Sequence, residues 1–545
     1  MASLFLVALD QTIIATALGK IVEDFNAFSS LSWIVTAYLI TTTMTVPIAG
    51  KLSDLFGRRT ILLIGVAVFV AGSLLSGLSG NITELIAWRA LQGIGGGIIT
   101  ANAFTIVGDL FAARERGRWQ GLIGAVFGLS SVIGPLLGGW LTDGAHFFGL
   151  TTDWRWTFFI NVPVGIVAFI LIAIYCPALR HATKVKIDYW GAALLSIATA
   201  VLILAVDNTE TIFADVMTST GLTLVWLRVI MFAVVAAAIA GFIYVERKAD
   251  EPILPLRFFK NRNFVTVLAI ATFFGAAFMG SILYLTQFNQ QVFGATPTQS
   301  GLMLLPMVAG IMISSIGSGQ IISRTGRYKI FMQIGFLVAT ASMVALTFLT
   351  PETPYLYEAV VMTILGLGMG VAMPVLNLAI QNEVEQKDLG VATSSSQLFR
   401  SLGSTIGTAV FGAMLTAGIV SQVAAMKNTE YIKSLGQSSQ VSAIGNLDDA
   451  NTLLTLNTPD IKQKITDAAD AQFSKLPDAY ATKAREQFNT NQQEFASIVT
   501  HAFSDSLQRI FIVASSLVGF SAVMVFTLKE RTLRSAKPDA TPGEA

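Results

Sequence analysis

Long apolar segments alternate with short polar ones along almost the whole chain. A run of about 20 apolar residues is long enough to cross a lipid bilayer as an α-helix. Fourteen such runs are found, and they lie near residues 2–21, 31–50, 60–79, 84–108, 118–142, 156–177, 189–206, 226–245, 264–288, 300–322, 329–349, 356–379, 393–420 and 506–528. The pattern predicts an all-α integral membrane protein with fourteen transmembrane helices.

The lysines and arginines of the connecting segments predict how these helices are oriented. Cytoplasmic loops of membrane proteins carry an excess of these residues. With the N-terminus inside, the short outer loops hold only Lys20, Arg155 and Arg228. We therefore expect both termini to be cytoplasmic and the protein to lie in the cell membrane. The first run begins next to Met1 without the features of a cleaved signal peptide, so we expect a membrane helix there, preceded by a short tail in the complete protein.

One hydrophilic segment between the second and third runs recurs later in the chain. It reads GKLSDLFGRR over Gly50–Arg59. The stretch Gly319–Lys329 repeats its glycines and first arginine at the same spacing, with Ser323 at the place of Asp54. The glycines permit a tight turn, so we expect a loop here. Two copies of such a loop predict two homologous halves, which is how many secondary transporters are built.

Two basic linkers, 180–188 and 246–263, divide the chain into larger units. We expect two pseudo-symmetric six-helix bundles, at 1–178 and 263–528, with an inserted helix pair at 179–262 between them. Residues 529–545 are expected to form a disordered cytoplasmic tail. The polar segment 421–505 is expected on the outer face, inside the second bundle. From Thr458 as N-cap, it is predicted to form a helical hairpin that extends the neighbouring membrane helices; a partner surface is the alternative.

Two charged side chains fall inside membrane helices. Asp10 lies in the first run, where a carboxylate costs about 2.5–3.5 kcal/mol on insertion scales and normally serves a function. We predict that it binds a proton or substrate, and a structural hydrogen bond is the alternative. Arg89, three residues before Gln92, stays charged and needs a partner. Asp10, Gln92 or backbone carbonyls could provide one, unless Arg89 reaches the outer interface beside Trp88.

The fifth run is rich in glycine and has a central Gly-Pro pair. Small residues let helices approach closely, and proline bends a helix. We expect a bent helix, packed against a neighbour, that could seal or open a pathway, with key positions Gly121, Gly134, Pro135, Gly138 and Gly139. The sixth run begins with Trp154-Arg155-Trp156, which is typical of an anchor at the membrane interface.

Together these motifs resemble the major facilitator superfamily, specifically its fourteen-helix drug:proton antiporter branch. The resemblance covers nearly the whole chain and rests on five motifs. In chain order they are the Asp10 motif, the two-glycine loop, Arg89 with Gln92, the glycines of the fifth run, and the WRW…NVP sequence. The departures are small. Leu55, Ser130 and Gly19 stand where the family usually has arginine, glycine and proline.

The resemblance implies two bundles that rock around a central cavity, with the fifth helix marking export. It implies that Asp10 takes a proton from outside and releases it inside, tuned by Arg89. The loop is then a conformational switch, made of Gly50, Asp54, Gly57, Arg58 and Arg59. Asp54 is expected near the start of the helix that begins around Thr393, where a carboxylate favours the positive helix end.

The substrate cavity can be predicted only coarsely. Aromatic residues with few polar anchors suit varied lipophilic ligands, and the candidates are Tyr38, Phe274, Phe278, Tyr284 and Gln287. For each of them, lipid-facing or core packing is the alternative. With one deep acid, we expect neutral or singly charged substrates and one proton per cycle.

Composition excludes several other classes of function. The charge balance of +1 gives no reason to expect nucleic-acid binding, and three histidines with one cysteine, Cys176, argue against a metal site. No phosphate-binding loop is present, so we expect a monomeric transporter, not an enzyme, that needs no cofactor and is driven by the proton gradient. Two alternatives remain: an exporter of one native lipid, siderophore or antibiotic, with an envelope partner on 421–505, and a transport-inactive membrane sensor.

Overall fold

The fold is known from a computed structural model of the chain. It describes residues 1–25, 31–142, 144, 146–147, 150–177, 188–206, 209–295, 297–436, 447, 452–453, 456–457, 459–474, 477–531 and 533. Within these residues, thirteen helices are long and apolar enough to cross a membrane, and α1 contributes a shorter apolar helix over Ala2–Leu18. The protein is therefore a multi-pass membrane protein, whereas the count of fourteen spans stays a prediction.

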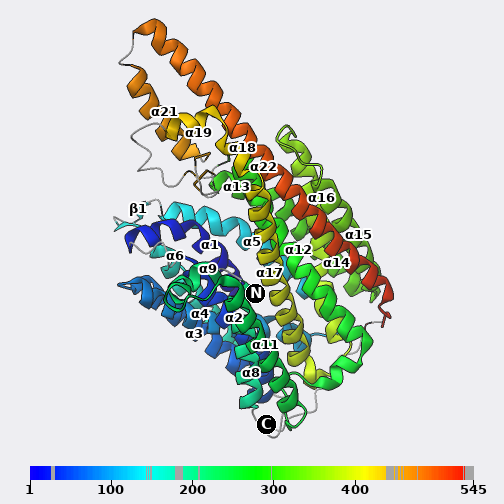
Figure 1. Ribbon diagram of the computed structural model, residues 1–545. Helices are drawn as coiled ribbons and strands as arrows, with labels where there is room; N and C mark the ends of the chain where they lie inside the picture. The colour runs from blue at the N-terminus through cyan, green and yellow to red at the C-terminus, as the bar shows by residue number, and fades with distance from the viewer. Residues whose placement is uncertain are drawn as a thin grey trace.

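The N-terminal group of helices occupies one side of the molecule (Figure 1). It comprises α1 (Ala2–Asp24), α2 (Leu31–Phe56), α3 (Arg58–Leu78), α4 (Ile82–Leu110), α5 (Ala113–Thr142), α6 (Trp156–Phe159) and α7 (Asn161–Tyr175). Two-residue strands, β1 (His146–Phe147) and β2 (Leu150–Thr151), pair antiparallel after α5. α6 and α7 together form the sixth predicted helix, since Ile160 between them keeps helical backbone angles and its N–H donates to the Trp156 carbonyl. Within the group, α4 packs against α2 and α3, and α1 packs against α5.

The predicted inserted pair corresponds to α8 (Tyr189–Val206) and α11 (Leu224–Glu246), which pack against each other. Short helices α9 (Thr209–Ile212) and α10 (Ala214–Thr220) connect them. Contacts of α8 with α2 and α17 place the pair beside both groups of helices. Most of the first predicted linker, 180–188, lies outside the described residues.

The C-terminal group begins after the short helix η2 (Leu256–Lys260). Its long helices are α12 (Arg262–Gln291), α14 (Leu305–Thr325), α15 (Lys329–Leu346), α16 (Tyr355–Gln381), α17 (Leu389–Val420) and α22 (Asp478–Thr527), with α13 (Pro297–Met303) and η3 (Gln386–Asp388) as short pieces. The tenth predicted helix is broken at Leu304, because Pro306 starts a new helix there. Close packing joins α12 with α17 and α14 with α16.

The last helix is much longer than the predicted run 506–528. α22 has 50 residues and is one continuous helix from the outer segment into the membrane. Helices α18 (Val423–Lys427), α19 (Glu430–Gly436) and α21 (Pro459–Phe473) accompany its outer part, as Figure 1 shows. Thr458, the predicted N-cap, lies outside the described residues, but α21 begins at the next residue. The hairpin of α21 and α22 therefore extends one membrane helix, the last.

The segment Gly50–Arg59 is helical for most of its length, so its description as a loop was wrong. α2 continues to Phe56 and α3 starts at Arg58, which leaves only Gly57 between them, with φ of 97°. The matching residue of the second copy, Gly326, also has positive φ, at 72°. Helical backbone satisfies its own hydrogen bonds, so the chain needs only one glycine in a left-handed conformation to turn.

Candidate functional site

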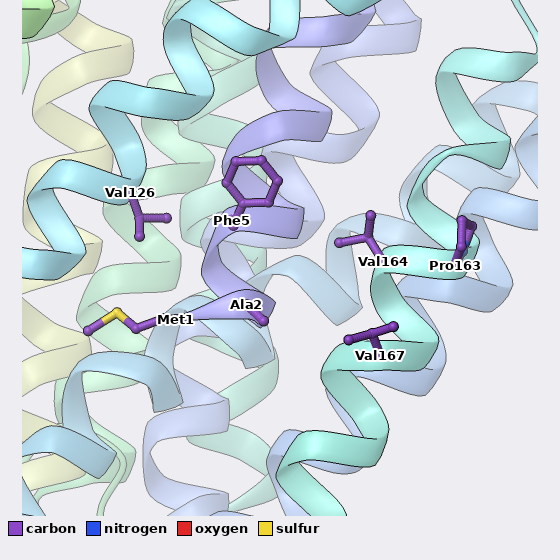
Figure 2. A pocket seen from close by; sticks show the side chains of 7 residues that line it. All are labelled: Met1, Ala2, Phe5, Val126, Pro163, Val164 and Val167. Atoms are coloured by element: carbon purple, nitrogen blue, oxygen red, sulfur yellow. The ribbon is translucent and has the colours of Figure 1, made fainter.

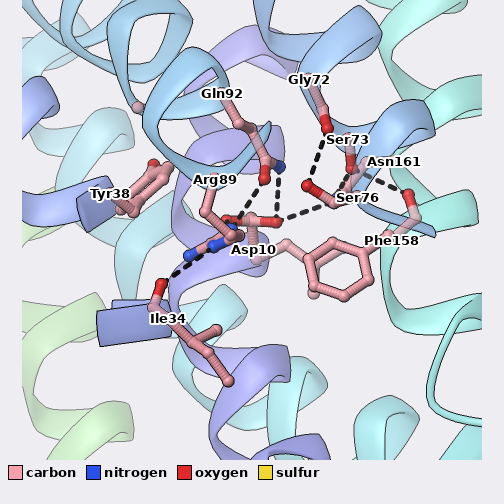
Figure 3. Close-up of polar contacts among 12 residues, drawn as sticks. Asp10, Ile34, Tyr38, Gly72, Ser73, Ser76, Arg89, Gln92, Phe158 and Asn161 are labelled. Atoms are coloured by element: carbon pink, nitrogen blue, oxygen red, sulfur yellow. Dashed lines mark hydrogen bonds and ion pairs between the residues drawn. The ribbon is translucent and has the colours of Figure 1, made fainter. Parts of the chain in front are cut away.

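A cluster of buried polar side chains surrounds Asp10 of α1 (Figure 3). The side chain of Asp10 is 1% exposed. Its Oδ2 accepts from Arg89 Nη1 at 2.7 Å. Its Oδ1 accepts from Gln92 Nε2 at 2.8 Å and from Asn161 Nδ2 at 2.9 Å. Helices α1, α4 and α7 therefore meet on a single carboxylate.

Arg89 is enclosed on its remaining sides. Its guanidinium carbon lies 4.3 Å from the centre of the Tyr38 ring and 5.8 Å from that of Phe158, as in cation–π contacts. Nε donates to the Ile34 carbonyl at 3.4 Å, and Nη1 also donates to Gln92 Oε1 at 2.7 Å. Since Arg89 is only 1% exposed, it does not reach the outer interface, which was the alternative.

Two members of this cluster were missed from the sequence. Asn161 also donates to Ser73 Oγ at 3.1 Å, and Ser73 Oγ donates to the Phe158 carbonyl at 2.9 Å. An asparagine inside an apolar run was a signal that could have been used, because a buried amide needs partners. The motif around it had been interpreted only as a membrane anchor.

The ion pair of Asp10 and Arg89 has no access to water that could replace either partner. A buried arginine that loses its counter-ion is costly, because its charge then has no partner. The contacts among α1, α4 and α7 therefore depend on this ion pair.

A second buried charge cluster lies at the junction of α2 and α3. Arg58 is fully buried and forms ion pairs with Asp54 and, at 2.7 Å, with Asp109 of α4. Arg58 Nη1 also donates to Ser53 Oγ at 2.5 Å. Its neighbour Arg59 takes no part and donates instead to the Ala173 carbonyl of α7. Of the predicted switch, only Asp54 and Arg58 thus form one ionic unit.

This junction contacts the start of α17 in the C-terminal group. A Cβ atom at Gly390 would lie 2.6 Å from both Asp54 carboxylate oxygens and from Arg58 Nη1. Gly50 of α2 also lies close against Ser394 and Gly390 of α17. A Cβ atom built at Gly50 would lie 2.8 Å from the Gly390 carbonyl oxygen. Asp54 therefore lies at the N-terminus of α17, as expected, although this helix begins at Leu389 rather than near Thr393.

The same side of the molecule carries further contacts between the two groups. Gln120 Nε2 of α5 donates to Gln381 Oε1 of α16 at 3.0 Å, and Gln381 Nε2 donates to the Phe104 carbonyl at 3.3 Å. Arg114 Nε donates to the Ser323 carbonyl, in the second copy of the loop, at 2.9 Å. The two groups are therefore closed against each other on the side that carries the α2–α3 junction.

The glycines of α5 face two different neighbours. A Cβ at Gly121 would overlap the Ser315 carbonyl oxygen of α14, and Ser315 Oγ donates to the Gly121 carbonyl at 2.9 Å. A Cβ at Gly134 would overlap Thr12 Oγ1 of α1. Helix α5 therefore joins the helix that carries Asp10 to the opposite group.

The other key positions of α5 extend this pattern only in part. Gly138 lies against α1, where a Cβ would come 2.7 Å from the Ile13 carbonyl oxygen. Pro135 lies near α13, with its Cβ 3.7 Å from a Cβ built at Gly301. Gly139 is half-buried. The close approach of helices thus depends on Gly121, Gly134 and Gly138.

The structure does not bring the five predicted cavity residues together. Tyr38 packs on Arg89, whereas Phe274, Phe278, Tyr284 and Gln287 lie on α12. Phe274 is buried and stacks on Phe278 at 5.4 Å between ring centres. Tyr284 is buried and donates to the Thr408 carbonyl at 3.1 Å. Phe274 and Tyr284 are therefore core residues, which was the alternative to a place in the substrate cavity.

One apolar pocket lies among α1, α5 and α7 (Figure 2). Its lining holds no charged side chain and consists of Met1, Ala2, Phe5, Val126, Pro163, Val164 and Val167. Such a lining accepts lipophilic molecules. None of the five predicted cavity residues contributes to it, since a pocket between helices depends on packing that the sequence alone does not specify.

Comparison with known proteins extends these observations. A model of the Major Facilitator Superfamily matches residues 1–408. Multidrug transporter protein MdtP of Bacillus subtilis is 36% identical over 542 residues, which cover 98% of this chain and 93% of the relative. Multidrug resistance protein 3 of the same species is 33% identical, over 97% and 95%.

Solved structures show the same fold. The human organic anion transporter MFSD10 aligns with a TM-score of 0.56 at 13% identity, over 95% of this chain and 97% of that one. The fucose:proton symporter FucP of E. coli aligns with a TM-score of 0.53 at 14% identity, over 76% and 90%. At these identities the likeness concerns the fold alone.

Proposed function

This chain belongs to the Major Facilitator Superfamily, and we propose that it is a drug efflux transporter that exchanges lipophilic or small amphipathic compounds for protons. Two relatives matched over nearly their whole length are named multidrug transporter and multidrug resistance protein. The pocket among α1, α5 and α7 is shallow and apolar, so it suits a lipid chain as well as a lipophilic substrate. The proton gradient is the energy source, and no cofactor takes part.

The observation that carries proton coupling is the buried ion pair of Asp10 and Arg89. An ionisable group inside a membrane helix is costly and is normally functional. In the proposed cycle, a proton that reaches Asp10 from outside displaces Arg89, and its release inside restores the 2.7 Å contact. Because α5 touches both α1 and α14, a change around Asp10 is transmitted to the interface of the two groups.

The α2–α3 junction serves in this proposal as a latch on the cytoplasmic side. Asp54 lies at the N-terminus of α17, where a helix attracts negative charge, and Arg58 holds it there. The described contacts keep that side closed, and opening it requires Asp54 to leave Gly390. Alternating access then corresponds to making and breaking this contact, in a protein with both termini in the cytoplasm of the cell.

Transport into everted membrane vesicles tests the proposal, because their cytoplasmic face points outwards. A lipophilic cationic dye or a neutral dye is added outside vesicles with an acidic lumen, and its uptake is measured. We expect the parent protein to move at least one dye in a gradient-dependent manner, and Asp10→Asn to abolish this transport. The matched control is Asp215→Asn, because Asp215 is exposed on α10 and the chemical change is the same.

Each result has a definite meaning. Undiminished transport by Asp10→Asn would show that coupling does not depend on this carboxylate. Movement of neither dye by the parent protein would favour an exporter dedicated to one native compound. Equal loss in Asp215→Asn would point to a general effect of the substitution on folding, which the amount of protein in the membrane would reveal.

A further inference from the structure

A second buried carboxylate lies in the C-terminal group, on a helix of its own. Glu358 belongs to the first turn of α16 and is 0% exposed. In the sequence it stands among the first residues of the apolar run 356–379, where a glutamate usually reaches water. α14 runs in the same direction as α16, since Gly310 lies against Thr363 and Gly370 lies against Ile311 and Ser314. Glu358 therefore lies towards the side opposite the α2–α3 junction.

The polar partner of Glu358 is the amide of Asn289, near the end of α12. With its nitrogen towards the acid, this amide donates to the two carboxylate oxygens at 2.8 and 2.9 Å. Asn289 is itself 0% exposed. An amide offers donors on one side and an acceptor on the other. After a half-turn it can therefore accept a hydrogen bond from protonated Glu358, so Asn289 suits both states of the acid.

No cation among the described residues pairs with Glu358. Five helices pack against α16, namely α5, α12, α14, α15 and α17. Their charged residues lie towards the side of the α2–α3 junction, and they are Arg114, Glu115, Arg116, Arg118, Arg262, Arg324, Lys329 and Arg400. The tyrosines of these elements are Tyr284, which donates to a carbonyl, and Tyr355 and Tyr357 on α16 itself.

Charge compensation distinguishes Glu358 from Asp10. Asp10 has a guanidinium at 2.7 Å, whereas Glu358 has only an amide and the positive end of its own helix. A buried carboxylate without a cation is costly, and binding a proton removes that cost. A purely structural contact at this place would be made equally well by glutamine, which carries no charge.

A pocket lies at the same end of α16, one turn away from Glu358. Its lining consists of Tyr355, Phe293, Gly294, Ala295, Gln299, Leu302 and Met303. The Tyr355 hydroxyl donates to the Met303 carbonyl at 2.9 Å, and Tyr355 is exposed. The exposed turn before Glu358 is therefore the nearest point on its own helix from which water can approach the acid.

We propose that Glu358 and Asn289 form a second proton-binding site of the transporter, towards the side opposite the α2–α3 junction. This inference rests on the proposed proton-coupled export. It replaces one proton per cycle with up to two, one carried by each group of helices. Exchange of two protons for one singly charged cation moves net charge, so a membrane potential can drive it, whereas exchange for one proton is electroneutral.

Infrared spectroscopy of purified protein tests proton binding without requiring transport. A protonated buried carboxylic acid has a C=O stretching band that disappears when the acid ionises. We expect one component of this band in a pH titration of the parent protein to be lost in Glu358→Gln and to be retained in Asp10→Asn and in Glu352→Gln. Glu352 is a matched control, because its side chain is 70% exposed shortly before α16.

An unchanged band in Glu358→Gln would overturn the proposal. If that variant cannot be purified, Asn289→Leu leaves the acid in place but removes its hydrogen-bond partner. We then expect the band to shift in frequency, and no shift would equally overturn the proposal. Because this readout needs no substrate, it decides the protonation of Glu358 even if Asp10→Asn transports normally and the proposed function fails.

Transport in proteoliposomes tests the number of protons. With a singly charged lipophilic cation as the dye, transport driven by membrane potential alone is compared with transport driven by a pH gradient alone. We expect Glu358→Gln to lose the first and to retain most of the second, while Glu352→Gln retains both. Retention of potential-driven transport by Glu358→Gln would show that this acid carries no coupled proton.

Discussion

At the scale of single residues, Arg58 has the most demanding surroundings, because it compensates two buried carboxylates at once. We expect Arg58→Gln to destabilise the protein strongly, since removing one partner from a buried ion pair costs about 3–5 kcal/mol. Asp54 and Asp109 would both stay buried after losing their ion pair with Arg58. The measurement is the melting temperature of the purified protein, together with dye efflux.

The neighbouring arginine offers a matched control. Arg59 carries the same charge but donates only to the Ala173 carbonyl in the described contacts. Arg59→Gln should therefore melt within a few degrees of the parent protein and retain efflux. A similar loss of stability in both variants would mean that total positive charge matters, not the pairing of Arg58 with two acids.

The sequence identified charged residues of the site better than neutral ones. Asp10 and Arg89 could be predicted because a charge in a membrane helix demands a partner, and these two lie on neighbouring helices. Asn161 and Ser73 were missed. The asparagine in an apolar run indicates that a buried partner exists, but a neutral polar group does not specify which helix that partner belongs to. Glu358 was missed because the burial of a residue near a helix end is set by the packing of other helices.

At the scale of helices, the contact of α5 with α14 depends on the absence of a side chain. We expect Gly121→Ala to impair efflux, because the added methyl group would overlap the Ser315 carbonyl oxygen. Overpacking of this kind costs about 1–3 kcal/mol. In this protein the added methyl group would destabilise the arrangement in which the two groups of helices are closed against each other. Cysteine cross-linking between α5 and α14, compared with efflux, measures the effect.

A control glycine lies on α14 itself. Apart from the backbone of its own helix, no atom lies within 4 Å of the position that a Cβ would take at Gly317. Gly317→Ala therefore adds a methyl group in open space, and this variant should keep both the cross-link and the transport rate. Normal cross-linking and transport in Gly121→Ala would show that the helices can separate without cost and that this close approach is unimportant.

Helix positions were predicted well, but their ends were not. Apolar runs locate the membrane-spanning part of a helix, and a helix can continue through polar residues beyond it. For this reason α2 extends to Phe56 and α22 begins at Asp478, both well outside their apolar runs. The break at Leu304 went unnoticed because apolar composition is the same on both sides of it.

At the scale of the whole molecule, the outer helices extend the hydrophobic core of the C-terminal group, and Tyr431 belongs to this extension. This residue of α19 is 0% exposed, and its ring centre lies 5.6 Å from that of Phe488 and 5.3 Å from that of Phe495, both on α22. We expect Tyr431→Ala to release the outer helices from α22, since removing a buried aromatic side chain costs about 3–5 kcal/mol. Limited trypsin digestion should then cut faster near Lys433.

Efflux of dye should be unaffected by this release if the outer segment has no role in transport. Tyr480→Ala is the control, because Tyr480 lies on α22 and is 71% exposed. Loss of efflux in Tyr431→Ala alone would instead support the alternative in which 421–505 is a functional surface. Equal digestion of both variants would show that Tyr431 does not hold the outer helices in place.

The length of α22 has a mechanical consequence. At 1.5 Å per residue, its 50 residues form a rod of about 75 Å, of which a bilayer core covers only about 30 Å. Figure 1 shows the outer part of α22 projecting beyond the other long helices, so a tilt of its membrane part is magnified at its outer end. When the C-terminal helices tilt by a few degrees, the far tip sweeps through several ångströms. A protein that binds the outer end of α22 and prevents its movement would therefore inhibit transport from outside the cell, without entering the transport pathway.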